Sequence, residues 1–275
     1  MPRIFIPHIS IQERRISITG EKARYLTTVL KCRKGDELVI FDDEGNCLKT
    51  KILKTYRREV LAEVLEEFFC DTESALNIIL VQGLLKGQKM DLIVQKATEL
   101  GVKEVQPVIT VRSQLRDTRK VARWKKIAEE ASEQSGRSVV PLVHEPMHFN
   151  EWLSLLTVSN TLKGFIFYEE EGIRISEAVE SLRLSTEGIA TDFRINNPPS
   201  SPLIKGGQRG ITDKAELPSD VFVLIGPEGG FTKDEVAAAE KTGFIVTTLG
   251  KRIFRAETAA ISAITLMQFL LGDLG

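Results

Sequence analysis

The sequence predicts an α/β protein with two parts, a small β-barrel or sandwich followed by a parallel sheet covered by helices. Short strands with alternating apolar residues and hairpin-type turns fill residues 1–72. From Asn77 onward, apolar strands alternate with amphipathic helices, a rhythm typical of a parallel sheet. Because 275 residues suffice for roughly two domains, we assign residues 1–72 to the first and residues 73–275 to the second.

The first domain is predicted to contain several short strands and one helix. Apolar and polar residues alternate along each strand, and Asp43 to Asn46 has the composition of a turn. Helical spacing over about Glu21 to Lys31 interrupts the strands. The expected strands are RIFIP (3–7), RISIT (15–19), ELVIFD (37–42), CLKTKIL (47–53) and VLAEVLE (60–66).

The second domain is predicted to alternate strands with helices. Helical stripes of apolar residues mark residues 88–101 and a segment around Trp124. The helix Thr258 to Leu271 is apolar on nearly every side, so the domain or a second subunit must cover it. Residues 188–218 lose all periodicity, and we expect a mobile surface insertion there. The expected strands are NIILVQGLL (77–85), VQPVITV (105–111), VVPLV (139–143), FIFYE (165–169), VFVLI (221–225) and FIVTTL (244–249).

Composition restricts the function classes. No signal peptide and no apolar stretch of membrane-spanning length is present, so we expect a cytoplasmic protein that contacts no membrane. Three widely spaced cysteines without a CxxC pair favour neither a disulfide framework nor a zinc site, and we interpret them as small buried apolar residues.

The whole chain has a net charge of −1, but two segments carry a local excess of positive charge. Residues 1–35 carry eight basic side chains against two acidic ones, and residues 112–126 carry seven against one. Such patches bind phosphate groups in nucleic-acid-binding proteins, although a solvated basic face is the alternative for either run.

The stretch from His144 to His148 matches the HExxH pattern of zinc metalloproteases. That chemistry needs both histidines on one face of a continuous helix, with the glutamate beside a metal-bound water. Pro146 disfavours helical geometry at Glu145, and the segment leaves an extended run. We therefore expect a loop and no metal, with a zinc hydrolase as the alternative.

A glycine-rich loop, IGPEGGFTKDEV, joins an apolar strand directly to a helix start at residues 225–236. It lacks the spacings of phosphate-binding loops, Glu228 adds a negative charge, and Thr232 to Glu235 form a predicted capping box that uses the first helical N–H groups. The loop therefore suits a neutral or cationic ligand better than a phosphate. The alternative is a tight turn that uses glycine for its geometry alone.

A second strand-to-helix junction follows at LGKRIFRAETA, residues 249–259. Loops after neighbouring parallel strands lie at the same edge of the sheet, where such sheets bind ligands. Arg252 and Arg255 supply positive charge for a polyanionic partner. A third candidate is EQSGR, residues 133–137, where Gln134 and Arg137 can hydrogen-bond a base or a phosphate, although a solvated helix end explains them equally well.

Together, EQSGR, LIGPEGGFTKDE and LGKRIFRAETAA resemble the ribosomal RNA small subunit methyltransferase E family of the SPOUT superfamily. The resemblance covers nearly the whole chain, because PRIFIP resembles the start of the family's PUA-like domain and KGQKMDLIVQKATELGV the start of its catalytic domain. It departs modestly from the family's usual LGPRILRTETA at Lys251, Phe254 and Ala256, which affects the pocket lining more than the loop itself.

The resemblance implies an enzyme that methylates N3 of a uridine in 16S rRNA of the small ribosomal subunit, with S-adenosylmethionine as cofactor. It implies a PUA-like β-barrel that binds RNA, a SPOUT-type parallel sheet with a C-terminal trefoil knot, which is an exception to the rule against threaded chains, and a homodimer. A SPOUT methyltransferase with another RNA target and a non-catalytic RNA-binding protein are the alternatives.

The resemblance also implies roles for individual residues. Arg255 and Arg137 are candidates to stabilise charge on the uracil oxygens, and Glu257 is a candidate proton acceptor. The strand end at Phe167 to Glu169 completes the expected pocket. The expected cofactor-binding residues are Gly226, Pro227, Glu228, Gly229, Gly230, Leu249, Gly250, Ile253, Phe254 and Arg255. The expected RNA-binding residues are Arg3, Arg14, Arg15, Arg24, Arg33, Gln134 and Arg137.

Overall fold

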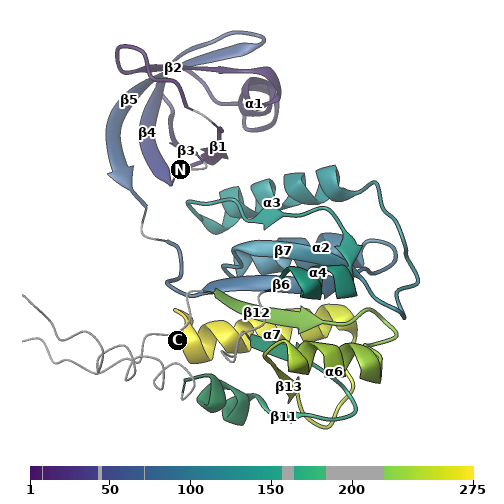
Figure 1. The fold of residues 1–275 in the computed structure, drawn as a ribbon. Coiled ribbons are helices and arrows are strands. Elements are labelled where there is room, and N and C mark those ends of the chain that lie inside the picture. The colour runs from purple at the N-terminus through teal and green to yellow at the C-terminus, as the bar shows by residue number, and fades with distance from the viewer. Residues whose placement is uncertain (8, 43–44, 71, 157–163, 184–219) are drawn as a thin grey trace, which may run out of the picture.

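A computed structural model describes residues 1–7, 9–42, 45–70, 72–156, 164–183 and 220–275. Figure 1 shows a curled β-domain next to a larger α/β domain, as the sequence predicts. The region of the predicted insertion, residues 188–218, lies outside the described residues. Among the helices of the described ranges, none combines the length and apolarity needed to cross a membrane.

The first domain is a curled five-stranded sheet with strand order β1-β3-β4-β5-β2. Its core includes Ile18 and Ile40 from the strands and Leu26 from the helical segment, and these three side chains are at most 2% exposed. The predicted helix divides into a short α-helix and a π-helical turn. The elements are β1 (Arg3–Phe5), β2 (Arg15–Thr19), α1 (Gly20–Arg24), η1 (Tyr25–Val29), β3 (Glu37–Phe41), β4 (Asn46–Thr55) and β5 (Glu59–Phe69).

The cysteine prediction is wrong for two of the three residues. Cys47 and Cys70 are buried as expected but joined by a disulfide, whereas Cys32 is free and half-buried. The antiparallel register of β4 and β5 explains the pairing, because Cys47 lies opposite Phe68 and Cys70 follows two residues later. An odd number of cysteines therefore did not exclude one bridge between neighbouring strands.

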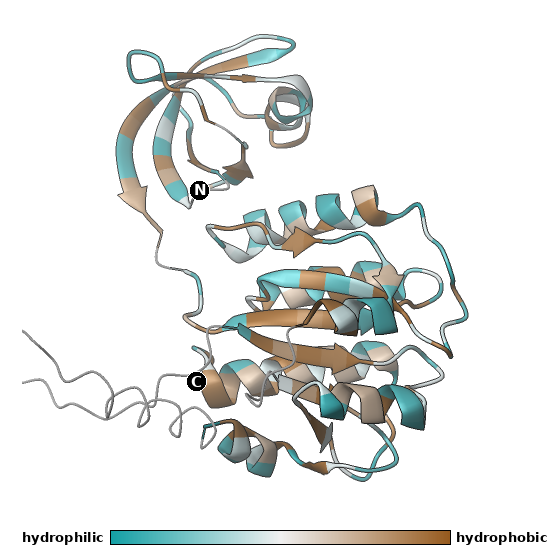
Figure 2. Ribbon diagram, in the orientation of Figure 1, coloured by the Kyte–Doolittle hydropathy of each residue, from teal (hydrophilic) through white to brown (hydrophobic). Residues whose placement is uncertain are grey.

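The second domain is a parallel sheet with order β11-β13-β10-β12-β6-β7-β8, and β9 pairs with β7 outside this path. All of its pairings are parallel within the described residues. Figure 2 shows that the central strands are hydrophobic along most of their length, whereas several helices present hydrophilic residues outward. The strands are β6 (Asn77–Gly83), β7 (Glu104–Ile109), β8 (Leu142–Val143), β9 (Met147–His148), β10 (Gly164–Phe167), β11 (Ile173–Arg174), β12 (Asp220–Ile225) and β13 (Phe244–Thr248).

Helices cover both faces of this sheet, so two apolar layers form. One layer lies between the sheet and helices α2, α3 and α7 and buries residues such as Leu80, Ile93 and Ile264. The other layer, on the opposite face, contains Phe149, Trp152 and Phe231. The last helix packs against α2 with Ala260, Ala263, Ile264 and Met267, but Phe269 stays 63% exposed. The helices are α2 (Lys89–Glu99), α3 (Val121–Ser135), α4 (Phe149–Leu155), α6 (Lys233–Lys241) and α7 (Ala256–Leu271).

Candidate active site

The candidate site is a pocket at the carboxyl edge of the parallel sheet. It encloses about 380 Å³, a volume typical of small-molecule sites. Its walls come from the ends of three neighbouring strands and from the start of α2 and α7. The lining residues are Lys89, Phe167, Tyr168, Glu169, Ile225, Gly226, Pro227, Glu228, Gly230, Thr248, Leu249, Gly250, Arg252, Ile253, Phe254, Arg255, Ala256, Glu257 and Ala259.

The glycine loop after β12 is held in a tight turn by its own backbone. The N–H of Gly230 donates to the carbonyl of Pro227 at 2.9 Å, and Gly230 has a φ of +68°, which other L-residues rarely adopt. The predicted capping box is confirmed, because Thr232 and Glu235 each bond the other's backbone N–H. The first turn of α6 is therefore satisfied by protein groups, which leaves the loop backbone to form the pocket wall.

Glu228 does not give the loop the free negative charge that the sequence predicts. Lys89 donates to its carboxylate at 2.8 Å, across 139 positions of the chain. Burial alone would raise the pKa of Glu228, but the hydrogen bond from Lys89 and those from backbone N–H groups lower it below its ordinary value. The hydrogen bond to Glu228 likewise raises the pKa of Lys89, and the charges of Glu257 and Arg255 act on the same ammonium with opposite signs.

We expect this pair to make stability depend on pH at both extremes. The pKa of Glu228 lies below its ordinary 4.5 in the folded protein, so its contribution is complete above that pH and is lost as the pH falls through the folded pKa. The pKa of Lys89 lies above 10.5, so its contribution is complete below that pH and is lost as the pH rises through the folded pKa.

The measurement is thermal unfolding of wild type and Glu228→Gln as a function of pH. The difference in Tm should be constant near neutral pH and should shrink as acid protonates Glu228. Glu99→Gln, which removes the exposed partner of Lys96 on α2, is the control and should change Tm little at any pH. A Tm difference for Glu228→Gln that persists undiminished in strong acid would contradict the assignment.

The second loop, between β13 and α7, forms the other half of the pocket. Thr248 and Gly250 hydrogen-bond each other at 3.2 Å, and the Arg252 guanidinium lies 6.0 Å from the centre of the Phe254 ring. Arg255 precedes the first residue of α7 and is exposed, whereas Oε2 of Glu257 is buried without a hydrogen-bond partner. An ionisable group placed this way in a pocket is a candidate for chemistry.

Glu169, two residues after the end of β10, connects the third wall to the glycine loop. A Cβ added to Gly230 would lie 2.2 Å from Oε1 of Glu169, so the loop can approach this carboxylate only because Gly230 has no side chain. We expect Gly230→Ala to displace Glu169 and to weaken ligand binding in the pocket about tenfold, or 1.4 kcal/mol.

The control for Gly230→Ala is Gly20→Ala in the first domain. Gly20 has the same φ of +68° but no atom within 4 Å of an added Cβ, so it reports the backbone strain alone. Calorimetry with S-adenosylmethionine is the measurement. Equal effects of the two variants on binding would show that the contact with Glu169 has no role.

Most of the predicted cofactor residues do converge on this pocket, although they come from loops about 20 residues apart. Two differ in detail. Gly229 is not among the lining residues and instead faces Arg112, whose guanidinium donates to the carbonyls of Gly229 at 3.0 Å and Phe231 at 3.2 Å. Ile253 lines the pocket but is 81% exposed in a single chain, so it walls the pocket only on one side.

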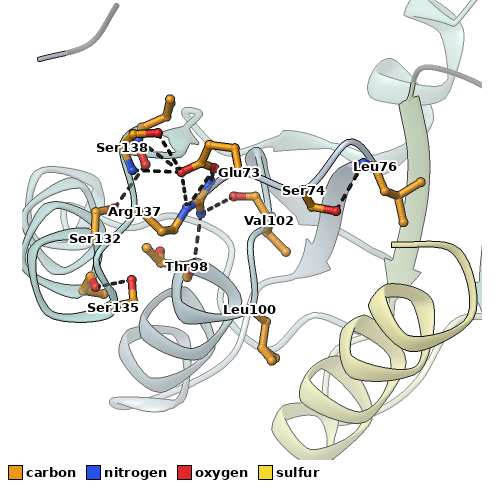
Figure 3. Close-up of polar contacts among 12 residues, drawn as sticks. Glu73, Ser74, Leu76, Thr98, Leu100, Val102, Ser132, Ser135, Arg137 and Ser138 are labelled. Carbon is orange, nitrogen blue, oxygen red and sulfur yellow. Dashed lines mark hydrogen bonds and ion pairs between the residues drawn. The ribbon is translucent and has the colours of Figure 1, made fainter. Parts of the chain in front are cut away.

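The structure does not bring Arg137 to the pocket or to the surface. Its side chain is 5% exposed and forms an ion pair with Glu73 at 2.6 Å, while Nη1 donates to the carbonyls of Thr98 at 3.0 Å and Val102 at 2.8 Å. Figure 3 shows the guanidinium surrounded by these acceptors. Because the guanidinium is buried and each of its nitrogens already donates a hydrogen bond, it is not exposed to RNA, so we correct the catalytic and RNA-binding predictions for Arg137 to a structural role.

Glu73 lies in the connection between the two sheets, and the Arg137 backbone also contacts the first domain. Arg3 donates to the carbonyl of Arg137 at 3.0 Å and lies 3.6 Å from the sulfur of Cys70. Burial lowers the pKa of Arg3 although Glu73 acts in the opposite direction. Arg3 is therefore an interdomain contact in this structure, not a freely exposed cation as the RNA-binding prediction assumes.

The other predicted RNA-binding residues are exposed. Arg14 donates to the carbonyls of Val64 and Leu65, which fixes its guanidinium on β5. Gln134 lines a separate cleft between the first domain and helices α2 and α3. The remaining three, Arg15, Arg24 and Arg33, are exposed on the first domain.

The HExxH stretch is not helical, as the proline predicts. His144 follows β8 and contacts Glu104 at 2.7 Å, and His148 ends β9. The two imidazoles therefore lack the one-turn helical spacing of a zinc protease. Within the part of the chain that the structure describes, no group of three or more metal-binding side chains is found.

The sequence does not predict two side chains that contact the glycine loop. Lys89 reaches Glu228, and Arg112 holds the glycine loop. Arg112 begins the basic run at residues 112–126, so charge was a signal for it. Lys89 begins a helix, and nothing local relates it to a loop more than a hundred positions later.

Two family models match separate parts of the chain. The RNA methyltransferase domain family matches residues 72–192 and 202–268, and the RNA methyltransferase PUA domain family matches residues 18–65. This chain belongs to the ribosomal RNA small subunit methyltransferase E family. The family resemblance predicted from the sequence is thereby confirmed.

Individual proteins match over nearly the full length. The enzyme from Neisseria gonorrhoeae, crystallised with S-adenosyl methionine, is 30% identical, with 100% of both chains covered and a TM-score of 0.80. A protein from Legionella pneumophila in complex with the bound cofactor SAM is 25% identical, with 99% and 98% covered and a TM-score of 0.77. The ribosomal RNA small subunit methyltransferase E of Buchnera aphidicola is 27% identical over 99% of this chain and 95% of its own.

Proposed function

We propose that this chain uses S-adenosylmethionine to methylate N3 of a specific uridine in the 16S rRNA of the small ribosomal subunit. The observation that carries the proposal is a pocket built from the two loops after β12 and β13, in a member of a family with a relative bound to S-adenosyl methionine. The pocket lies at the edge of the sheet where α/β proteins bind nucleosides.

The pocket residues suit this cofactor. Gly226 lies so close to the following turn that an added Cβ would be 3.1 Å from backbone atoms of Gly230 and Phe231, so backbone groups face the ligand there. The carboxylates of Glu169 and Glu257 lie in the lining, and Oε2 of Glu257 has no hydrogen-bond partner. The lining balances the carboxylates of Glu169, Glu228 and Glu257 against the cations of Lys89, Arg252 and Arg255, so it has no net positive charge that would favour a phosphate.

The cofactor supplies a methyl group on a positively charged sulfur, which leaves as a thioether. The protein must orient N3 of the uracil toward the methyl carbon and remove the N3–H proton. The new N–C bond forms with the electron pair of the former N–H bond, and the electrons of the broken C–S bond stay on sulfur. The task of the protein is therefore positioning, proton removal and charge stabilisation.

We propose two side chains at the pocket for the last two tasks. We assign Glu257 as the proton acceptor because its carboxylate lies in the pocket with an unpartnered oxygen. We assign Arg255 to stabilise the negative charge that develops on the uracil oxygens, because its guanidinium is exposed at the pocket rim. Both residues begin or precede α7, so one helix start holds them at a fixed separation.

RNA docking is proposed for the exposed basic side chains of the first domain, Arg14, Arg15, Arg24 and Arg33. A homodimer is proposed because Ile253 and Phe269 are 81% and 63% exposed in one chain, one beside the pocket and the other on α7. We retain the trefoil knot, the domain boundary near residue 72 and a cytoplasmic location as parts of the proposal.

The test is nucleoside mass spectrometry on 16S rRNA from cells that lack the gene. Loss of 3-methyluridine, and its return with the wild-type gene, is the expected result. Purified protein should also form 3-methyluridine on small subunits from those cells when S-adenosylmethionine is added. Unchanged 3-methyluridine in the deletion strain, with another nucleoside lost instead, would favour a different RNA target.

A further inference from the structure

Basic side chains form an arc beside the pocket, on loops that follow β6 and β7. Both loops lie at the carboxyl edge of the sheet, next to the glycine loop, and Figure 1 shows the β7 and β12 strands pointing to that edge. We call this arc the cationic rim and define it as Lys86, Arg112, Arg116, Arg119 and Lys120. All five side chains are exposed.

Direct contacts fix the rim to the pocket wall. The backbone N–H of Lys86 donates to Glu228 at 3.3 Å, and Lys120 donates to the carbonyl of Gly87 at 2.7 Å. Arg112 donates to the carbonyls of Gly229 and Phe231, and Arg116 donates to the carbonyls of Thr110 and Val111. The two loops therefore form one continuous border on the glycine loop.

The rim retains positive charge because the nearby carboxylates are already engaged. Glu228 accepts from Lys89, and Asp91 accepts from Arg123 and the indole of Trp124. Asp117 accepts only from the backbone N–H of Thr118 at 2.7 Å and keeps its negative charge, but one carboxylate against five cations still leaves the rim positive. Within the described residues, the side chains of Lys86 and Arg119 make no hydrogen bond or ion pair, so they are free to bind an external anion.

We infer that the cationic rim binds backbone phosphates of the RNA strand on either side of the target nucleotide. This inference rests on the proposed function. A base can enter the pocket only when its nucleotide leaves the stack, and the flanking backbone then crosses the border of the pocket. Cations at that border position the strand without reading its sequence. The rim thus adds a second RNA surface, on the catalytic domain, to the basic face of the first domain.

The test is the double variant Lys86→Gln/Arg119→Gln, with Lys103→Gln/Lys241→Gln as the matched control. Lys103 directly precedes β7 and Lys241 ends α6 three residues before β13, so both control side chains lie at the opposite edge of the sheet. Each variant removes two exposed charges. Unmodified 16S rRNA from the deletion strain is the binding probe, and calorimetry with S-adenosylmethionine tests the pocket.

The rim variant should bind the RNA about tenfold more weakly, roughly threefold for each lost phosphate contact. Its plot of log affinity against log salt should be shallower by about 1.4, or roughly 0.7 for each contact on single-stranded RNA. Affinity for S-adenosylmethionine and all properties of the control should be unchanged. In single-turnover assays the loss should disappear at saturating RNA.

Equal RNA binding by the rim variant and the control would overturn the inference. So would a loss of affinity that leaves the salt slope unchanged. The binding assay needs no catalysis, so it distinguishes this failure from failure of the proposed function. If the wild-type protein binds RNA through the rim but never forms 3-methyluridine, the proposed function is wrong and the inference about the rim still holds.

Discussion

Arg137→Ala should destabilise the α/β domain by about 3 kcal/mol, the magnitude observed when one partner of a buried ion pair is removed. The substitution removes the guanidinium that donates to the carboxylate of Glu73 and to the carbonyls of Thr98 and Val102. For a chain of this length the loss corresponds to roughly 6 °C in Tm. Calorimetry or circular dichroism measures it directly.

A double-mutant cycle separates the ion pair from simple loss of packing. Glu73→Gln removes the charge but keeps an acceptor for the N–H groups of Ser138 and Val139. The double variant Arg137→Ala/Glu73→Gln should be less destabilised than the sum of the single variants, because no unpaired charge remains. Additive effects would show that Glu73 does not depend on Arg137. Arg119→Ala, with an exposed guanidinium, is the control and should change stability by less than about 0.5 kcal/mol.

The same variant decides between a structural and a catalytic Arg137. Well below its unfolding transition, Arg137→Ala should bind S-adenosylmethionine normally and methylate RNA within about threefold of wild type. Limited proteolysis should cut it faster near Glu73, because the connection between the domains loses an anchor. Normal Tm with methylation lost a hundredfold would restore the catalytic interpretation.

The division into a β-domain and a parallel α/β domain was predictable because it depends on local periodicity. Strand β12 is apolar at nearly every position, as a strand with helices on both faces must be. Helix α2 buries Met90, Ile93, Val94 and Ala97 on one stripe. Such patterns can be recognised from consecutive residues, without knowing which distant residues are in contact.

The polar contacts were harder to predict because they join residues far apart in the chain. The sequence correctly predicts the end of α3, where Gly136 has a φ of +79°, but not that Arg137 turns inward to a glutamate 64 positions earlier. For the same reason, the sequence does not predict the contact between Lys89 and Glu228, which lie 139 positions apart. A charged side chain next to a glycine stop looks exposed until its long-range partner is known.

The disulfide was predictable in principle. Strands β4 and β5 are consecutive and joined by a short turn, so pairing them from the turn outward places Cys47 opposite Phe68. The odd number and wide spacing of the cysteines predict no disulfide, whereas the register of β4 and β5 brings Cys47 and Cys70 close enough to form one. Geometry from predicted pairing is therefore the stronger argument when the two conflict.

Arg255→Ala should reduce the single-turnover rate of methylation by about 10²- to 10³-fold, the usual cost of removing one donor to a developing negative charge. The guanidinium lies at the pocket rim, where it is available to the uracil oxygens. Affinity for S-adenosylmethionine should be retained, because the expected contact of this loop with the cofactor is through its backbone. Arg252→Ala is the neighbouring control, since its guanidinium lies over the Phe254 ring, and it should lose less than about tenfold.

Glu257→Gln tests whether this loss reflects charge stabilisation or proton removal. If Glu257 accepts the N3–H proton, Glu257→Gln should be slow at neutral pH but should recover as alkaline pH ionises the uridine without a base. Arg255→Ala should not recover in this way, because its missing donor is equally absent at every pH. Parallel pH profiles for the two variants would contradict the assignment of separate roles. A recovery confined to Glu257→Gln would assign the proton to the carboxylate whose Oε2 has no partner in the pocket.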